Sequence, residues 1–198
     1  MGYRTDFLGT LQFNKEVTEE LKNFINGFSR TRKMRRSNDK IKEIFPDWED
    51  KCYKGSLGID GEYFIGGSGY AGQEHDSSIL NYNYPPSTQP GLWCQWIIND
   101  DNELEWDGGE KFYNYTEWLE YLIENFFKPG GYILNGTIHF QGEDDDDFGE
   151  IIAVNNNVSI DYGIHVQSLS EIDDNSLLKE LANRGYNLAE INKIERGA

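Results

Sequence analysis

Three glycines, Gly67, Gly69 and Gly72, have the spacing G-x-G-x-x-G within the stretch EYFIGGSGYAG. This spacing can hold a phosphate when a strand precedes it and a helix follows, because the amides of the helix N-terminus bind the anion. Residues 61–66 have the pattern of a strand, but the sequence after the last glycine is QEHDSSILNYNYPP. Its carboxylates repel phosphate and its prolines oppose a helix. We therefore interpret residues 66–90 as a long loop that is rich in glycine and tyrosine.

Carboxylates concentrate in two segments, GEDDDDFGE at 142–150 and NDDNELEWDGGE at 99–110. Such oxygen ligands can bind calcium, but Phe148 stands where an EF-hand loop needs an oxygen ligand. Carboxylates on rigid hairpins can instead imitate the spaced charges of a phosphate backbone, or discourage sheet edges from aggregating. Mimicry is our leading interpretation, and the residues expected to bind a partner are Asp100, Asp101, Glu103, Asp144, Asp145, Asp146, Asp147 and Glu150.

Aromatic side chains around the long loop support a second interpretation, a pocket for a small ligand or a nucleotide. The side chains expected to line it are Tyr70, Tyr82, Tyr84 and Trp93. The histidines lie in different predicted elements, so no nucleophile, base and orienting group can be assigned to one site. The sequence therefore indicates no catalytic residue, no metal ligand and no cofactor. A metal-dependent enzyme of unknown reaction is the third interpretation.

Net charge narrows the class of partner. The 198 residues include 35 Asp and Glu against 18 Lys and Arg, which gives a formal net charge of -17. This charge repels nucleic acid and anionic membranes, whereas it attracts basic protein surfaces. We expect a host protein with a basic surface as partner, with no direct binding of nucleic acid or membrane.

One basic run interrupts the acidic composition. It contains Arg30, Arg32, Lys33, Arg35 and Arg36. These residues can form a contact patch for an acidic partner. We favour the alternative that they form a solvated segment, which balances the acidic field around it.

The cysteines and the apolar segments indicate an intracellular compartment. Cys52 and Cys94 are far apart, with no C-x-x-C motif and no histidine cluster, so neither a disulfide framework nor a zinc site is indicated. No stretch reaches the roughly 18 apolar residues of a membrane span, and residues 1–30 lack the pattern of a signal peptide. We expect a reducing environment.

Hydrophobic periodicity predicts the secondary structure. Thr18 is a predicted N-cap, and Asn114 with Glu117 is a predicted capping box. The predicted helices begin after Thr18, near Ile41 and after Asn114. The predicted strands are residues 5–13, 61–66, 92–98, 103–106, 132–141, 151–154 and 158–160.

This order of elements predicts an α+β fold, an antiparallel sheet with two helices packed on one face. The simplest topology is a ferredoxin-like β-α-β-β-α-β core with extra strands. The sequences GTLQF at 9–13 and GTIHF at 136–140 occupy equivalent places in its two halves. We expect residues 1–163 to form this domain and residues 164–198 to form short helices packed on it.

Several sequence elements fall within residues 91–160: EWDGGEKFYNY-EWL-YLI, the following LNG, and GED-DD-G-I. Together they resemble a group of uncharacterised proteins encoded by bacteriophages and prophages. The segment GTLQFNKEVTEEL is similar in kind. The resemblance implies a phage or mobile-element origin, and it brings no catalytic residues with it.

Phage genomes encode many small acidic proteins that bind and block host machinery, including CRISPR effectors and restriction enzymes. We therefore expect this chain to be an acidic, protein-binding inhibitor of a host defence system. It would act in the cytoplasm of the host bacterium by occupying a basic surface.

Overall fold

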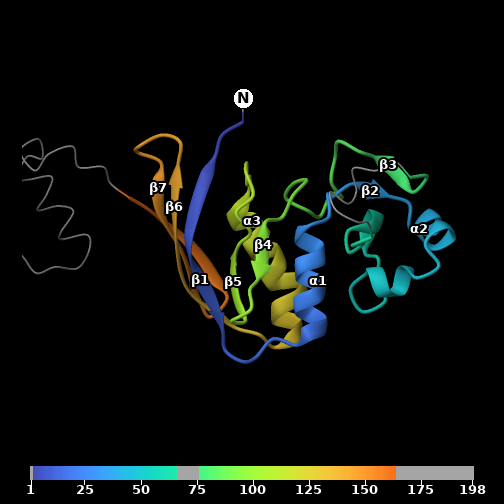
Figure 1. Ribbon diagram of the computed structural model, residues 1–198, viewed down its shortest axis with the longest axis horizontal. Helices are drawn as coiled ribbons and strands as arrows, with labels where there is room; N and C mark the ends of the chain where they lie inside the picture. The colour runs from blue at the N-terminus through green and yellow to red at the C-terminus, as the bar shows by residue number, and fades with distance from the viewer. Residues whose placement is uncertain (1, 67–75, 164–198) are drawn as a thin grey trace, which may run out of the picture. The chain divides into compact units, whose positions relative to one another are not determined.

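A computed structural model describes residues 2–66 and 76–163 (Figure 1). Its largest element is a six-stranded antiparallel sheet with the strand order β4-β5-β1-β6-β7-β8. Apolar residues alternate along the strands because only one face of the sheet is buried. The strands are β1 (Thr5–Phe13), β4 (Trp96–Ile98), β5 (Glu103–Trp106), β6 (Leu134–Gly142), β7 (Phe148–Val154) and β8 (Asn157–Tyr162).

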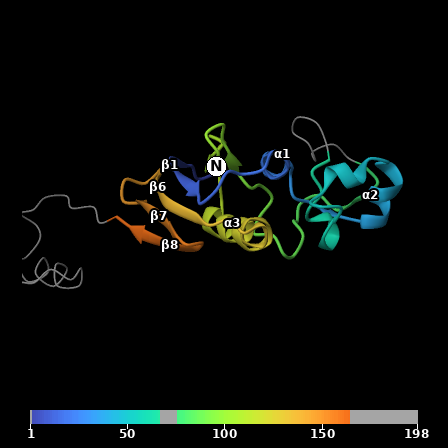
Figure 2. The same cartoon turned by 90° about the horizontal axis from the view of Figure 1, so that it is seen from below.

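Helices α1 and α3 pack on the same face of the sheet (Figures 1 and 2). α1 spans Glu19–Ser29, and the Leu21 N–H donates to Oγ1 of its predicted N-cap, Thr18 (3.4 Å). α3 spans Tyr115–Leu122 and continues through a π-helical turn, Ile123–Phe127. The predicted α+β class with an antiparallel sheet is confirmed.

The connections depart from a simple ferredoxin layout in two places. Strands β7 and β8 extend the sheet beyond β6. Residues 31–93, which we call the insertion, separate α1 from β4 (Figure 1). The insertion contains α2 (Asn38–Ile44), β2 (Arg35–Arg36), β3 (Ile79–Asn81) and the 3-10 turns Trp48–Lys51 and Ile59–Gly61.

The strand predicted for residues 61–66 is wrong. Gly61 has a φ of 75°, and the Phe64 N–H donates to its carbonyl (2.9 Å), so the chain turns here. The apolar alternation has another cause, because neighbouring side chains enter two different cores. Phe64 belongs to the small core of the insertion, whereas Tyr63 and Ile65 pack against the main core.

Both helices are apolar on the side that faces away from the sheet as well. The ring centroid of Tyr53, from the insertion, lies 5.0 Å from that of Phe24 and 4.9 Å from that of Phe126. The Tyr63 ring lies 5.4 Å from Phe126. α1 and α3 thus contact both the sheet and the insertion, so they lie between these two parts (Figures 1 and 2).

A buried carboxylate joins the insertion to α3. Glu62 Oε2 accepts hydrogen bonds from the Tyr121 hydroxyl (3.1 Å) and from Thr88 Oγ1, and its Oε1 accepts one from the Ile59 N–H (2.9 Å). Gln89 Nε2 donates to the Glu62 carbonyl (2.8 Å). Since a buried carboxylate must have its oxygens satisfied, this network has a structural role.

Two glycines let β1 and β6 approach each other closely. Gly9 and Gly136 have φ angles of 114° and 139°. A Cβ on Gly9 would lie 2.8 Å from the Thr137 carbonyl oxygen, and one on Gly136 would lie 2.9 Å from the Thr10 carbonyl oxygen. Thr10 and Thr137 are register partners, so the first three residues of GTLQF face the first three of GTIHF across the strand pair.

Some predicted features lie outside the described residues. They are the glycines of the G-x-G-x-x-G motif, Tyr70, and the short helices expected within residues 164–198. The described chain up to Gly163 forms one compact unit.

Candidate functional site

The two acidic segments lie at opposite ends of the sheet. Thr5, at the start of β1, pairs with Gly142, which leads into the acidic β6–β7 turn. Gln12, near the end of β1, pairs with Glu103, which follows the β4–β5 turn. A strand rises about 3.3 Å per residue, so the two turns are roughly 23 Å apart along the sheet.

Between these turns, the face of the sheet opposite the helices is acidic. Side chains alternate between faces along a strand, and Leu104 and Ile151 are buried in the core, so Glu103 and Glu150 lie on the other face. No described element covers this face (Figures 1 and 2). Asp6, Glu105 and Asp161 share it by the same alternation, and the six strands contain no Lys or Arg.

Asp6, at one end of this face, pairs with Arg4 (2.9 Å), whereas Glu103 and Glu150 have neutral or weakly basic neighbours. Glu103 accepts hydrogen bonds from Thr10 Oγ1 (2.7 Å) and Gln12 Nε2 (3.2 Å). Glu150 Oε1 lies 3.2 Å from His139 Nδ1, and Glu150 is also the register partner of Asp161. Like charges that are directly opposite each other destabilise a sheet. The carboxylates on this face are therefore not arranged for stability alone.

The β6–β7 turn presents three exposed aspartates, Asp144, Asp145 and Asp146. Asp147 differs, because its Oδ2 accepts a hydrogen bond from the Tyr3 hydroxyl (2.5 Å). That hydrogen bond raises the pKa of Tyr3 above its ordinary value. Asp147 thus has a structural partner, while the other three carboxylates extend into solvent.

The β4–β5 turn is exposed in the same way. Asp100 is fully exposed and lies 3.3 Å from Lys22 Nζ, and Asp101 is exposed as well. An exposed pair of this kind contributes little to stability, so these carboxylates remain available to a partner.

The basic run is only in part the solvated segment that we favoured, because Arg30 and Arg35 are exposed whereas Lys33 and Arg36 are buried. Lys33 is buried, and its Nζ donates to the Phe28 carbonyl (2.6 Å) and lies 3.2 Å from the centroid of the Phe28 ring. Burial lowers the pKa of Lys33 well below its ordinary value. Arg36 is also buried and pairs with Asp76 (2.7 Å). Both cations therefore anchor the insertion from buried positions, Lys33 through the carbonyl and ring of Phe28 and Arg36 through Asp76.

The aromatic residues proposed for a ligand are only partly brought together. The Arg32 guanidinium lies 4.4 Å from the ring centroid of Tyr82 and 5.9 Å from that of Trp93. Tyr84 is exposed, and its carbonyl accepts a hydrogen bond from the Arg35 N–H (3.1 Å). The Arg32 guanidinium therefore lies near the rings of both Tyr82 and Trp93, while Tyr84 is not part of this group.

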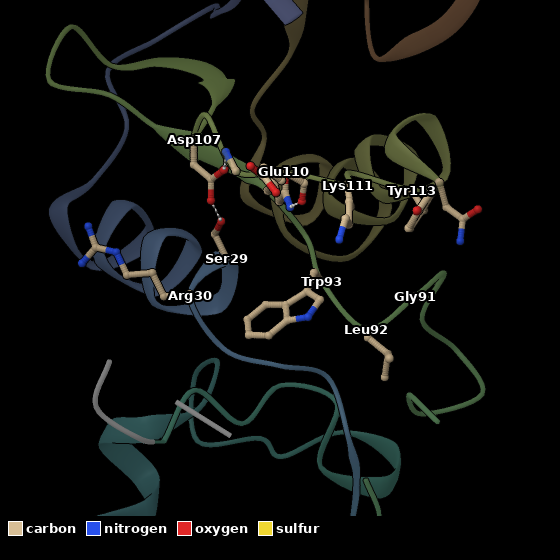
Figure 3. A pocket seen from close by; sticks show the side chains of 12 residues that line it. Ser29, Arg30, Gly91, Leu92, Trp93, Asp107, Glu110, Lys111 and Tyr113 are labelled. Atoms are coloured by element: carbon tan, nitrogen blue, oxygen red, sulfur yellow. Dashed lines mark hydrogen bonds between the residues drawn. The ribbon is translucent and has the colours of Figure 1, made fainter. Parts of the chain in front are cut away.

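Trp93 also lines a hollow of about 930 Å³ that the sequence did not indicate (Figure 3). Its walls come from the end of α1, from the segment before β4 and from the loop after β5. The polar or charged side chains among them belong to Ser29, Arg30, Gln95, Asp107, Glu110, Lys111, Tyr113 and Asn114.

Asp107 is one of two carboxylates that line the hollow, the other being Glu110. Its Oδ1 accepts a hydrogen bond from the Gly109 N–H (2.8 Å), and its Oδ2 accepts a longer one from Ser29 Oγ (3.5 Å). Partial burial raises the pKa of Asp107 above its ordinary value. This carboxyl group can therefore accept a hydrogen bond, and it is protonated more readily than a solvated aspartate.

The predicted capping box at the start of α3 is wrong. Asn114 has a φ of 55°, whereas a capping residue needs an extended backbone. Its Nδ2 donates to the Pro90 carbonyl (2.6 Å), and the Glu117 carboxylate accepts a hydrogen bond from Thr116 Oγ1 (3.0 Å). The first turn of α3, which faces the hollow, consequently has no side-chain cap.

Neither cysteine is suited to nucleophilic chemistry. Cys52 and Cys94 are buried free thiols. Burial raises the pKa of Cys94 to about 12, so its reactive thiolate is scarce at neutral pH. Across residues 2–66 and 76–163, no three His, Cys, Asp or Glu side chains converge on a possible metal position.

The same described ranges contain no helix with the length and apolar character that crossing a membrane requires. Comparison with protein-family models, with curated proteins and with solved structures finds no match for this chain.

Proposed function

We propose that this chain is a phage-encoded inhibitor of host defence that binds a basic, nucleic-acid-binding surface. A CRISPR effector or a restriction enzyme is the class of target. The sequence elements within residues 91–160 support the phage origin, and the net charge of -17 supports a basic partner. Occupation of the target's groove would exclude its nucleic acid in the host cytoplasm.

The observation that carries this proposal is the acidic, uncovered face of the sheet with an acidic turn at each end. Its rows of carboxylates have no Lys or Arg between them. Phosphates follow one another about every 3.4 Å along one DNA strand, so the roughly 23 Å between the turns corresponds to about seven phosphates. The face therefore offers a basic groove a negative surface of suitable length.

We further infer that β1, α1, β4, β5, α3 and β6 form a ferredoxin-like core, to which β7, β8 and the insertion are additions. The order β4-β5-β1-β6 within the sheet supports this interpretation. Such a core normally leaves one face of its sheet uncovered, and that is the face assigned here to the partner.

Neutralising the exposed aspartates of the β6–β7 turn is expected to weaken inhibition at least about tenfold. The variant is Asp144→Asn with Asp145→Asn and Asp146→Asn, and Asp147 is kept because it holds Tyr3. The measurement is the displacement of a labelled duplex from purified basic nucleic-acid-binding proteins, including a guide-loaded CRISPR effector and a restriction endonuclease.

The matched control removes the same number of charges elsewhere. It combines Glu49→Gln, Asp50→Asn and Glu120→Gln, all at exposed positions away from the sheet face. Equal losses in the two variants would indicate an effect of net charge and contradict recognition by the turn. If the unmodified protein displaced the duplex from none of the targets, the proposed function would be wrong.

Asp161→Asn provides a second test with opposite effects on two quantities. Because Asp161 faces Glu150 across β7 and β8, the substitution is expected to stabilise the fold by about 0.2–1 kcal/mol. It is also expected to weaken displacement of the duplex, since it removes a carboxylate from the binding face. Urea unfolding and the displacement assay measure the two effects. Stabilisation without any loss of displacement would show that Asp161 does not contribute to binding of the target.

A further inference from the structure

Two cations line the Trp93 hollow, although the protein as a whole is strongly acidic. Neither the Arg30 nor the Lys111 side chain has a hydrogen bond or an ion pair within the described part of the chain. The other described arginines, in contrast, all have such partners: Arg4, Arg32, Arg35 and Arg36. Burial raises the pKa of Asp107, and the charge of Arg30 opposes that rise, so Arg30 already has an acidic neighbour. Lys111 is the lining cation that favours an anionic ligand here.

A buried hydrogen-bond donor without a partner lies beside the same hollow. Trp118 is fully buried, and its Nε1–H has no acceptor. A Cβ placed on Gly91, a lining residue, would be 3.5 Å both from this nitrogen and from Asn114 Nδ2. The space that Gly91 leaves open is therefore next to an unused donor and next to the uncapped start of α3. Donors and the positive end of a helix dipole both favour an anion.

Trp93 supplies a flat aromatic surface within this space. It is partly buried, and the Arg32 guanidinium lies 5.9 Å from its ring centroid. In Figure 3 its indole lies in the middle of the hollow, with the Lys111 side chain extending toward it. An aromatic surface beside cationic groups suits a ligand that combines a planar ring with a negative charge.

We propose that the Trp93 hollow binds a small ligand with one anionic group and a planar ring, such as a nucleoside monophosphate or an aromatic carboxylate. The ring stacks on Trp93, and the anion lies between Lys111 and the Trp118 Nε1–H, while Arg30 lies on the far side of Trp93 (Figure 3). Asp107 and Glu110, on the same walls, repel additional negative charge, so di- and triphosphates are disfavoured. Asp107 is also placed to accept a hydrogen bond from an amino group on the ring.

The test is calorimetric titration of the full chain with adenosine 5′-monophosphate and with indole-3-carboxylate, which distinguishes the two sources of this chemistry. Adenosine and inorganic phosphate serve as the ring-only and anion-only probes. At least one two-part ligand is expected to bind ten or more times more tightly than either partial probe, and to raise the melting temperature.

Gly91→Ala is the most specific variant. Its added methyl group meets its neighbours at ordinary van der Waals distance, so the fold is expected to persist while access to Trp118 Nε1 is closed. A loss of affinity of tenfold or more is expected for Gly91→Ala and for Lys111→Ala. Lys128→Ala is the control, because Lys128 is an exposed lysine that pairs with Glu124 far from the hollow.

Two results would overturn the proposal. One is that no two-part ligand binds at millimolar concentration. The other is that Gly91→Ala and Lys111→Ala bind as well as the unmodified protein, which would mean that binding occurs elsewhere. The variant of the β6–β7 turn is expected to keep its ligand affinity, so the outcome here is independent of the role of the sheet face.

Discussion

Gly9→Ala and Gly136→Ala are each expected to lower the free energy of unfolding by about 2–3 kcal/mol, and the double variant is expected not to fold. Two effects combine at each position. The φ angles of 114° and 139° are unfavourable for any residue with a Cβ. The new Cβ would also lie within 3 Å of a carbonyl oxygen of the opposite strand, and that backbone cannot move without separating β1 from β6.

A comparison with Gly108→Ala separates these two effects. Gly108 has a φ of 81°, but a Cβ there would meet nothing within 4 Å. It therefore reports the backbone strain alone, about 1 kcal/mol. Urea unfolding followed by circular dichroism measures all the variants. If Gly9→Ala and Gly136→Ala were no more destabilising than Gly108→Ala, the close approach of β1 and β6 would not be a requirement of the fold.

Lys33→Met is expected to leave stability at neutral pH unchanged or to raise it by up to about 2 kcal/mol, because it removes an amine that is buried without a carboxylate partner. The methionine keeps the apolar contact with the Phe28 ring. The Phe28 carbonyl still has a hydrogen-bond donor in this variant, since the Thr31 N–H also donates to it (3.2 Å). No buried polar group is therefore left without a partner.

The pH dependence gives the sharper signature. Burial holds the pKa of Lys33 in the folded protein below 10.5, its ordinary value. Between these two pKa values the unfolded chain binds more protons than the folded chain, so the free energy of unfolding rises as pH rises through this window. Lys33→Met is expected to abolish that rise. The exposed Lys54→Met is the control and should retain it.

Unfolding curves measured from neutral pH to about pH 10 test this prediction. If the unmodified protein and Lys33→Met showed the same pH dependence, Lys33 would titrate in the folded protein as a solvated lysine does. The burial of Lys33 beneath the insertion would then be contradicted.

Elements that bury one continuous face could be predicted from the sequence. β1 and α1 have the expected bounds because their apolar residues recur with one period throughout. The β4–β5 hairpin could be predicted for the same reason, and Trp96 and Trp106 are register partners in it. The strand predicted for residues 61–66 was wrong because neighbouring side chains pack into two different cores, which produces the same alternation as a strand.

The short strands β2 and β3 could not be predicted, because two or three residues have no period. The long-range partners of Lys33 and Arg36 are equally invisible in the sequence, where a run of basic residues is typical of solvated surface. Only the three-dimensional structure shows that Lys33 lies against the Phe28 ring and that Arg36 pairs with Asp76.

The acidic turns were identified because composition alone reveals them. The Trp93 hollow was not, since its residues come from three segments that are distant in the sequence. One local signal existed: Gly108, Lys111 and Asn114 all have left-handed backbone conformations within a short loop. Residues other than glycine in this conformation are uncommon, and they concentrate at functional sites.

The position of the helices between the sheet and the insertion also has an evolutionary consequence. A relative that had lost residues 31–93 would expose the positions of Phe24, Tyr121 and Phe126 to water, so selection would replace them with polar residues. A relative that kept the insertion would keep these aromatics, together with the Glu62 that hydrogen-bonds to Tyr121. The residue types at these three helix positions would therefore distinguish relatives with the insertion from relatives without it.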